Sequence, residues 1–160
     1  MNFPVEIRRM SPADLARVME IARSLNEAPH WPRQAYLAAL NPESTPRRIA
    51  LVAADPETGT VAGFAVASLL EPQGELETIA VAAESQRHGL ARRLWAAMAE
   101  ELRQAEIREV LLEARASNHA ALGLYRAVGF NETGRRPRYY ADPVEDAVLM
   151  SLQLQVSNSV

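Results

Sequence analysis

Residues 79–93 read Ile-Ala-Val-Ala-Ala-Glu-Ser-Gln-Arg-His-Gly-Leu-Ala-Arg-Arg and combine three kinds of local structure. The apolar start is typical of a buried strand, the polar middle is typical of a turn, and Gly89 stands where a helix begins. A helix N-terminus leaves backbone N–H groups unpaired and carries partial positive charge, and glycine lets an anion come close to the backbone. The stretch predicts either a phosphate-binding turn or an ordinary strand-to-helix turn, and a dinucleotide-binding turn is disfavoured because G-x-G-x-x-G is absent.

The chain after this turn alternates helices and strands. Leucine or methionine recurs at every fourth position from Leu90 to Leu102, which predicts a helix with one face in the core. Strands are expected at 75–82 and 109–115, a helix at 118–128 that ends at Gly129, and two final strands at 130–136 and 146–154.

The chain before the turn reads strand, helix, helix, strand, strand. A strand at 5–10 precedes a helix that starts at Ser11-Pro12, and a second short helix is expected at 32–40. The strands 48–54 and 60–70 flank a turn and should form an antiparallel hairpin. Antiparallel strands followed by strands joined through helices predict a mixed α/β (α+β) sheet, and 160 residues without a linker predict a single domain over 1–160.

Composition removes several kinds of chemistry. All 17 basic residues are arginine, cysteine is absent, and the histidines are His30, His88 and His119. The sequence therefore excludes a Schiff-base lysine, a P-loop lysine, a cysteine nucleophile, a zinc–thiolate site and a disulfide. Carboxylates, tyrosines, histidines and backbone groups remain for proton transfer, and no metal is expected.

Charge and hydropathy limit the partners. The net charge of −3 does not suggest nucleic acid as a partner. The first ten residues lack the apolar run of a signal peptide, and no apolar stretch reaches the length of a membrane span. A cytoplasmic protein that does not bind membranes is the expectation.

A family resemblance appears at residues 86–91, Gln-Arg-His-Gly-Leu-Ala, which match the Q/R-x-x-G-x-G/A signature of the GCN5-related N-acetyltransferases (GNAT). Downstream, residues 112–118 (Leu-Glu-Ala-Arg-Ala-Ser-Asn), Leu124-Tyr125, Gly129-Phe130 and Tyr139-Tyr140 resemble the RimI branch, which acetylates the N-terminal alanine of ribosomal protein S18. The resemblance implies the GNAT fold, a mixed sheet of six to seven strands flanked by about four helices.

By this resemblance the chain binds acetyl-CoA between the strands 75–82 and 109–115. Ile79, Ala80 and Val81 would lie along the pantetheine and acetyl group, with the Val81 N–H polarising the thioester carbonyl. Asn118 matches a cofactor contact in the family, although an asparagine there is equally a helix cap. The pyrophosphate would bind the N–H groups of six consecutive residues, Arg87, His88, Gly89, Leu90, Ala91 and Arg92.

The resemblance also assigns the proton transfers. Glu113 stands in an otherwise apolar strand, where burial would make a carboxylate more basic, and it matches the general base; the alternative is an outward-facing residue of an alternating strand. Tyr125 matches the general acid near the sulfur, or is a packed aromatic residue. No covalent nucleophile is evident, so direct attack by the amine is expected.

The favoured acceptor is a protein N-terminus, that of ribosomal protein S18. The segment His30-Trp31-Pro32 departs from the family pattern in the acceptor-lining loop and leaves a small-molecule amine or a protein lysine as alternative acceptors. A CoA-binding module without catalysis is a third hypothesis, against which the presence of both Glu113 and Tyr125 argues. The basic segment 135–138 suits a solvated strand edge, and Tyr139 and Tyr140 suit the acceptor side.

Overall fold

A computed structural model of the chain describes residues 4–25 and 28–155. Seven strands form one sheet in the order β1-β2-β3-β4-β5-β7-β6. The strands are β1 (Glu6–Arg9), β2 (Arg47–Ala54), β3 (Val61–Leu70), β4 (Gln73–Val81), β5 (Glu109–Arg115), β6 (Asn131–Tyr140) and β7 (Glu145–Gln153). The helices are α1 (Leu15–Ser24), α2 (Arg33–Leu40), α3 (Leu90–Gln104) and α4 (His119–Val128), with short 3₁₀ turns η1 (Pro12–Asp14) and η2 (Ala83–Ser85).

The sheet changes direction at its centre. Strands β1 to β4 are antiparallel neighbours, including the β2–β3 hairpin expected from the sequence. Strands β4 and β5 are parallel because α3 crosses between them, and β7 then lies antiparallel between β5 and β6. The mixed sheet predicted from the sequence is confirmed.

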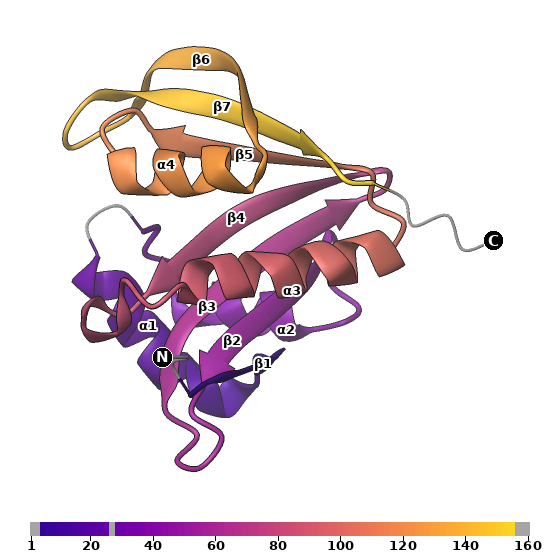
Figure 1. Cartoon of the computed structure of the whole chain (residues 1–160), viewed down its shortest axis with the longest axis vertical. Helices are drawn as coiled ribbons and strands as arrows, with labels where there is room; N and C mark the ends of the chain where they lie inside the picture. The colour runs from indigo at the N-terminus through magenta and orange to yellow at the C-terminus, as the bar shows by residue number, and fades with distance from the viewer. Residues whose placement is uncertain (1–3, 26–27, 156–160) are drawn as a thin grey trace.

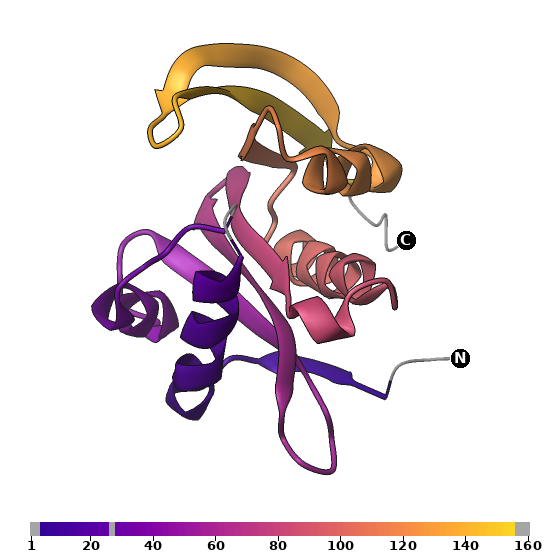
Figure 2. The ribbon, with the colours of Figure 1, turned by 90° about the vertical axis from the view of Figure 1, so that its left-hand side faces the viewer.

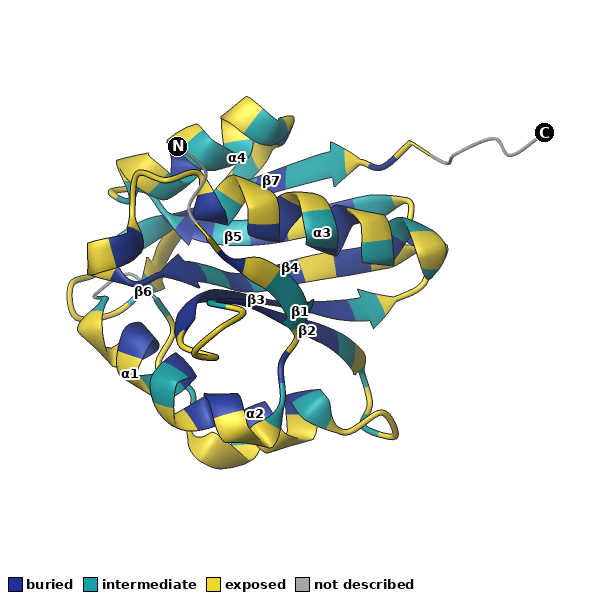
Figure 3. Ribbon diagram, turned by 60° about the horizontal axis from the view of Figure 1, so that its bottom comes forward, coloured by how far each residue is buried: buried dark blue, intermediate teal, exposed yellow. Residues whose placement is uncertain are grey.

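Helices cover both faces of the sheet, as Figures 1, 2 and 3 show, and each face has its own core. The amphipathic helix α3 buries Leu90, Leu94, Met98 and Leu102 against β2, β3 and β4, as its four-residue spacing predicted. On the opposite face α1 and α2 bury a second set, Leu15, Val18, Ile21, Tyr36 and Phe64. The two cores fix the central strand β4 from both sides, and β4 leads into the turn before α3.

Two sequence expectations differ from the structure in detail. The strand expected to end at Arg136 continues to Tyr140, because β6 is an edge strand in which Pro137 needs no ladder partner and the register shifts between Arg136 and Tyr140. The helical spacing of α4 puts Ala121, Leu124, Tyr125 and Val128 on one side, but its buried residue is Leu122. Leu124 and Tyr125 are half-buried and line a cavity. No helix in the described part of the chain is long and apolar enough to span a membrane.

Candidate active site

The parallel strands β4 and β5 are paired only where they begin. Gln73, Gly74 and Glu75 lie opposite residues 109–111, and beyond this point the strands diverge, toward the left of Figure 1. A cavity of about 760 Å³ lies there, lined by the rest of β4, the turn after it, the end of β5 and α4. Eleven of the twelve predicted site residues line it: Ile79, Ala80, Val81, Arg87, Gly89, Leu90, Ala91, Arg92, Glu113, Asn118 and Tyr125.

The backbone of β4 presents main-chain groups to this cavity. The N–H of Ala82 donates to the carbonyl of Ala62 on β3 at 2.8 Å. Because backbone groups alternate sides along a strand, Ile79 and Val81 direct theirs away from β3, to the side that β5 has left. The Val81 carbonyl there accepts a hydrogen bond from Nε2 of Gln86 at 3.1 Å. The Val81 N–H therefore points into the opening between the two strands.

The turn between β4 and α3 owes its shape to positive backbone angles. Gly89 is the N-cap of α3 with φ of +76°, and Arg87 has φ of +69°. A Cβ on Gly89 would meet no atom within 4 Å, so the left-handed angle, rather than a lack of space, favours glycine. Its conformation leaves the first N–H groups of α3 at the cavity wall, as a phosphate-binding helix start requires.

His88 differs from its neighbours in this turn. Its side chain is exposed and is not among the residues that line the cavity. The role predicted for its backbone N–H stays a prediction.

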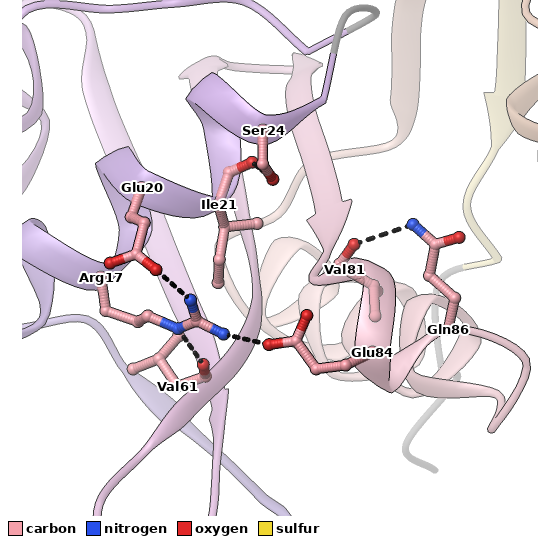
Figure 4. A network of polar contacts seen from close by, with 8 residues as sticks. All are labelled: Arg17, Glu20, Ile21, Ser24, Val61, Val81, Glu84 and Gln86. Atoms are coloured by element: carbon pink, nitrogen blue, oxygen red, sulfur yellow. Dashed lines mark hydrogen bonds and ion pairs between the residues drawn. The ribbon is translucent and has the colours of Figure 1, made fainter.

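An arginine on α1 anchors the same turn from the opposite side of the sheet (Figure 4). The Arg17 guanidinium donates to the carbonyl of Val61 at 3.2 Å, to Glu20 at 2.7 Å and to Glu84 of η2 at 2.6 Å. The backbone N–H of Glu84 and then Arg17 lower the pKa of the Glu84 carboxyl. These contacts tie α1 and the start of β3 to the segment that follows Val81.

Asn118 caps helix α4. Its Oδ1 accepts a hydrogen bond from the Ala121 N–H at 3.2 Å, so the helix-cap interpretation is confirmed. The side chain also lines the cavity, and its contact with a cofactor remains a prediction.

Glu113 lies on the cavity side of β5. The alternation of the strand turns Leu112 and Ala114 into the core and Glu113 to the opposite face, where 25% of its side chain is exposed. A hydrogen bond from the Tyr139 hydroxyl to Glu113, together with the negative charge of Glu113, raises the pKa of Tyr139. Arg136 Nη2 lies 3.6 Å from Glu113 Oε1. The apolar burial expected for this residue is therefore absent, and polar groups from β6 surround the carboxylate instead.

Tyr125 of α4 also lines the cavity. Burial and then the nearby Tyr140 raise the pKa of Tyr125 to about 12, so its hydroxyl is protonated at neutral pH. Its ring packs at 5.8 Å from that of Phe130 in an edge-on arrangement, which fixes its direction. A neutral phenol held in this way can donate a hydrogen bond or a proton to a group in the cavity.

Several lining residues had no firm place in the sequence prediction. Glu75 stands on β4 where the strands part, and burial followed by the negative charges of Glu77 and Glu113 raises its pKa. The loop after α1 contributes Leu25, Ala28 and Pro29. The alternation of Glu75 and Glu77 with Leu76 and Thr78 could have predicted an acidic face of this strand. No motif in the loop predicts its place at the cavity.

Tyr140 is held in the cavity wall by an arginine of β5. The Arg115 guanidinium lies 4.5 Å from the centre of the Tyr140 ring and 3.4 Å from Glu145, which in turn accepts a hydrogen bond from the Ser117 N–H at 2.7 Å. The contacts join the end of β5, the start of α4 and the β6–β7 hairpin. Tyr139 and Tyr140 both line the cavity, as suggested for the acceptor side.

Comparison with known proteins agrees with this geometry. The model of the acetyltransferase (GNAT) family matches residues 15–130. The [ribosomal protein bS18]-alanine N-acetyltransferase of Escherichia coli K12 is 38% identical over 102 residues, which are 62% of this chain and 69% of that protein. The N-alpha-acetyltransferase RimI of Mycobacterium tuberculosis is 37% identical over 153 residues, 92% of this chain and 91% of that protein.

A solved structure extends the likeness over the whole fold. The crystal structure of the ribosomal-protein-S18-alanine N-acetyltransferase from Escherichia coli superposes with a TM-score of 0.82 at 29% identity and covers 97% of each chain. The strands, the cavity between them and the relatives agree: the chain belongs to the acetyltransferase (GNAT) family, resembles its RimI branch, and is an N-acetyltransferase.

Proposed function

We propose that the protein transfers the acetyl group of acetyl-CoA to the α-amine of a protein N-terminus, that of ribosomal protein S18 being the favoured acceptor. The observation that carries the proposal is the meeting of four groups at one cavity: the inward N–H of Val81, the start of α3, Glu113 and Tyr125. A CoA-binding module without catalysis would need neither a carboxylate nor a neutral phenol at this cavity.

The residues around the cavity fit acetyl-CoA. A thioester of this kind supplies an activated acyl group and a thiolate leaving group. The first N–H groups of α3, with Arg87 and Arg92 beside them, suit the pyrophosphate, and main-chain groups of Ile79 and Val81 suit the linear pantetheine arm. Two relatives by fold were solved with this molecule, phosphinothricin acetyltransferase from Sinorhizobium meliloti and yncA from Salmonella typhimurium.

Three groups of the chain divide the chemistry. The Val81 N–H donates to the thioester oxygen, where negative charge develops as the amine attacks. Glu113, directly or through a water molecule, accepts the proton that the acceptor ammonium must lose before it becomes a nucleophile. Tyr125 is protonated at neutral pH and donates to the departing sulfur. The chain has no cysteine that could carry the acetyl group, so the amine attacks the thioester directly and no covalent acyl-enzyme forms.

The choice of acceptor rests on the relatives and on charge. The Escherichia coli relative acts on the alanine of bS18, and the Mycobacterium tuberculosis relative is an N-alpha-acetyltransferase. Glu75 and Glu113 face the cavity from neighbouring strands and favour a cationic acceptor such as an α-ammonium group.

An acceptor panel scored by CoA release tests the proposal. It contains a peptide beginning Ala-Arg, the same peptide acetylated at its N-terminus, an internal-lysine peptide and a polyamine. We expect rapid release with the first peptide and none with its blocked form. Faster release with the polyamine or the lysine peptide would replace the α-amine by one of those acceptors. No release with any amine, while acetyl-CoA still binds and raises Tm, would leave a binding module.

A further inference from the structure

Arg136 of β6 lies beside Glu113, the residue proposed as the general base. Its Nη2 lies 3.6 Å from Oε1 of Glu113, and its guanidinium carbon lies 5.5 Å from the centre of the Tyr139 ring. The Tyr139 hydroxyl lies near the same carboxylate, which raises the pKa of Tyr139. In the free protein, therefore, the group proposed as the base already has a cation and a hydroxyl beside it.

The charges around Glu113 explain why a cation lies there. Glu75 of β4 lies near both Glu77 and Glu113, and Glu77 is paired with Arg48 of β2 at 3.0 Å. The positive charge of Arg136 acts to lower the pKa of Glu75 and the pKa of Tyr139. The negative charge of Glu113 acts to raise the pKa of Tyr140 of β6. Glu75 and Glu113 thus share the positive charge of Arg136 at the cavity.

The contact is of a kind that a competitor can break. The Arg8–Asp14 pair elsewhere in the chain is bidentate, with hydrogen bonds of 2.8 and 2.9 Å. Arg136 makes a single, longer approach, and 57% of its side chain is exposed. Exposed ion pairs contribute little free energy, because water solvates the arginine when it leaves the carboxylate.

We propose that Arg136 is a placeholder for the acceptor: it takes, at Glu113, the position of the incoming α-ammonium group, and the acceptor binds by displacing it. Arg136 is then a specificity-determining residue that neutralises the carboxylates until a cation able to reach the cavity replaces it. The inference rests on the proposed function, because it takes Glu113 as the group that receives the amine.

Binding of the best acceptor from the panel, measured by calorimetry on protein saturated with CoA so that no turnover occurs, tests the placeholder. Arg136→Gln removes the competing cation, and we expect the acceptor to bind about two- to fivefold more tightly, the range that an exposed ion pair supplies. Arg136→Lys keeps a cation and should change affinity less. Arg135→Gln is the matched control, because it removes one charge at the adjacent position, where Arg135 pairs with Glu132 at 3.0 Å.

A double-mutant cycle shows whether the effect passes through Glu113. In a Glu113→Gln background, Arg136→Gln should no longer tighten binding. Unchanged or weaker acceptor binding in Arg136→Gln, an equal gain in Arg135→Gln, or a gain that persists without Glu113 overturns the inference. Failure of the proposed function is a separate result, the lack of acetyl transfer by the wild type to any amine of the panel. Thermal melting verifies that each variant is folded.

Discussion

Replacement of Gly89 by alanine separates the backbone requirement of the turn from its use as a phosphate site. The residue has φ of +76° and an added Cβ would meet no protein atom within 4 Å, so the folded state is penalised only by the left-handed angle. That angle costs a non-glycine residue about 1–2 kcal/mol. For a chain of this size, each kcal/mol corresponds to a fall in Tm of about 2–4 °C.

Binding of CoA should suffer more than folding at this position. The open space beside Gly89 is where the proposal places the pyrophosphate, so a methyl group there either contacts the ligand or turns an N–H away from it. Loss of one hydrogen bond to a charged group costs about 1.5–3 kcal/mol, which is roughly a tenfold or greater rise in Kd.

The chain supplies its own control. Gly59, in the β2–β3 turn, has the same φ of +76° and an equally open Cβ position, and it does not line the cavity. Gly59→Ala should therefore lose similar stability in urea unfolding and keep the affinity for CoA measured by calorimetry. Equal CoA affinities in the two variants would falsify the assignment of the α3 start as the phosphate site.

The remaining predictions concern three single residues. Tyr125→Phe should slow acetyl transfer while leaving CoA affinity nearly unchanged. Because the folded-state pKa of Tyr125 is raised to about 12, the unfolding free energy of the wild type should also fall relative to that of the variant between pH 10 and pH 12. Asn118→Ala should lower the unfolding free energy by about 1 kcal/mol through loss of the helix cap, whereas Asn118→Asp should keep the cap. If only the aspartate variant binds CoA more weakly, a phosphate of CoA lies close to this side chain. Tyr36→Phe removes a buried hydroxyl that has no hydrogen-bond partner among the described residues, so urea unfolding should show stability unchanged or raised by up to about 1 kcal/mol, and a clear loss would reveal a hidden partner.

Local signals explain which parts of the site are predictable from the sequence. The strand, turn and helix around Gly89 are neighbours in the chain, so their order alone predicts the helix start and the direction of α3. The spacing from Leu90 to Leu102 predicts the buried face of that helix in the same way. The cap at Asn118 also depends only on residues within one turn.

The residues that surround Glu113 cannot be predicted from local sequence patterns. Its neighbours Arg136 and Tyr139 come from the edge strand β6, which β7 separates from β5 in the sheet. An apolar strand sequence suggested burial, yet the alternation of β5 turns Glu113 away from the core. Sheet order and edge position are set by tertiary packing, and no residue pattern within one strand encodes them.

The divergence of β4 and β5 also affects the tendency of the chain to aggregate. A strand edge with unpaired N–H and C=O groups is a template on which foreign strands can add, and edges of this kind usually lie at the outside of a sheet. Here such an edge faces inward, beyond residue 75 of β4, with α4 and the loop after α1 beside it. An edge that would be an aggregation hazard at the outside of the sheet is therefore enclosed by the fold itself.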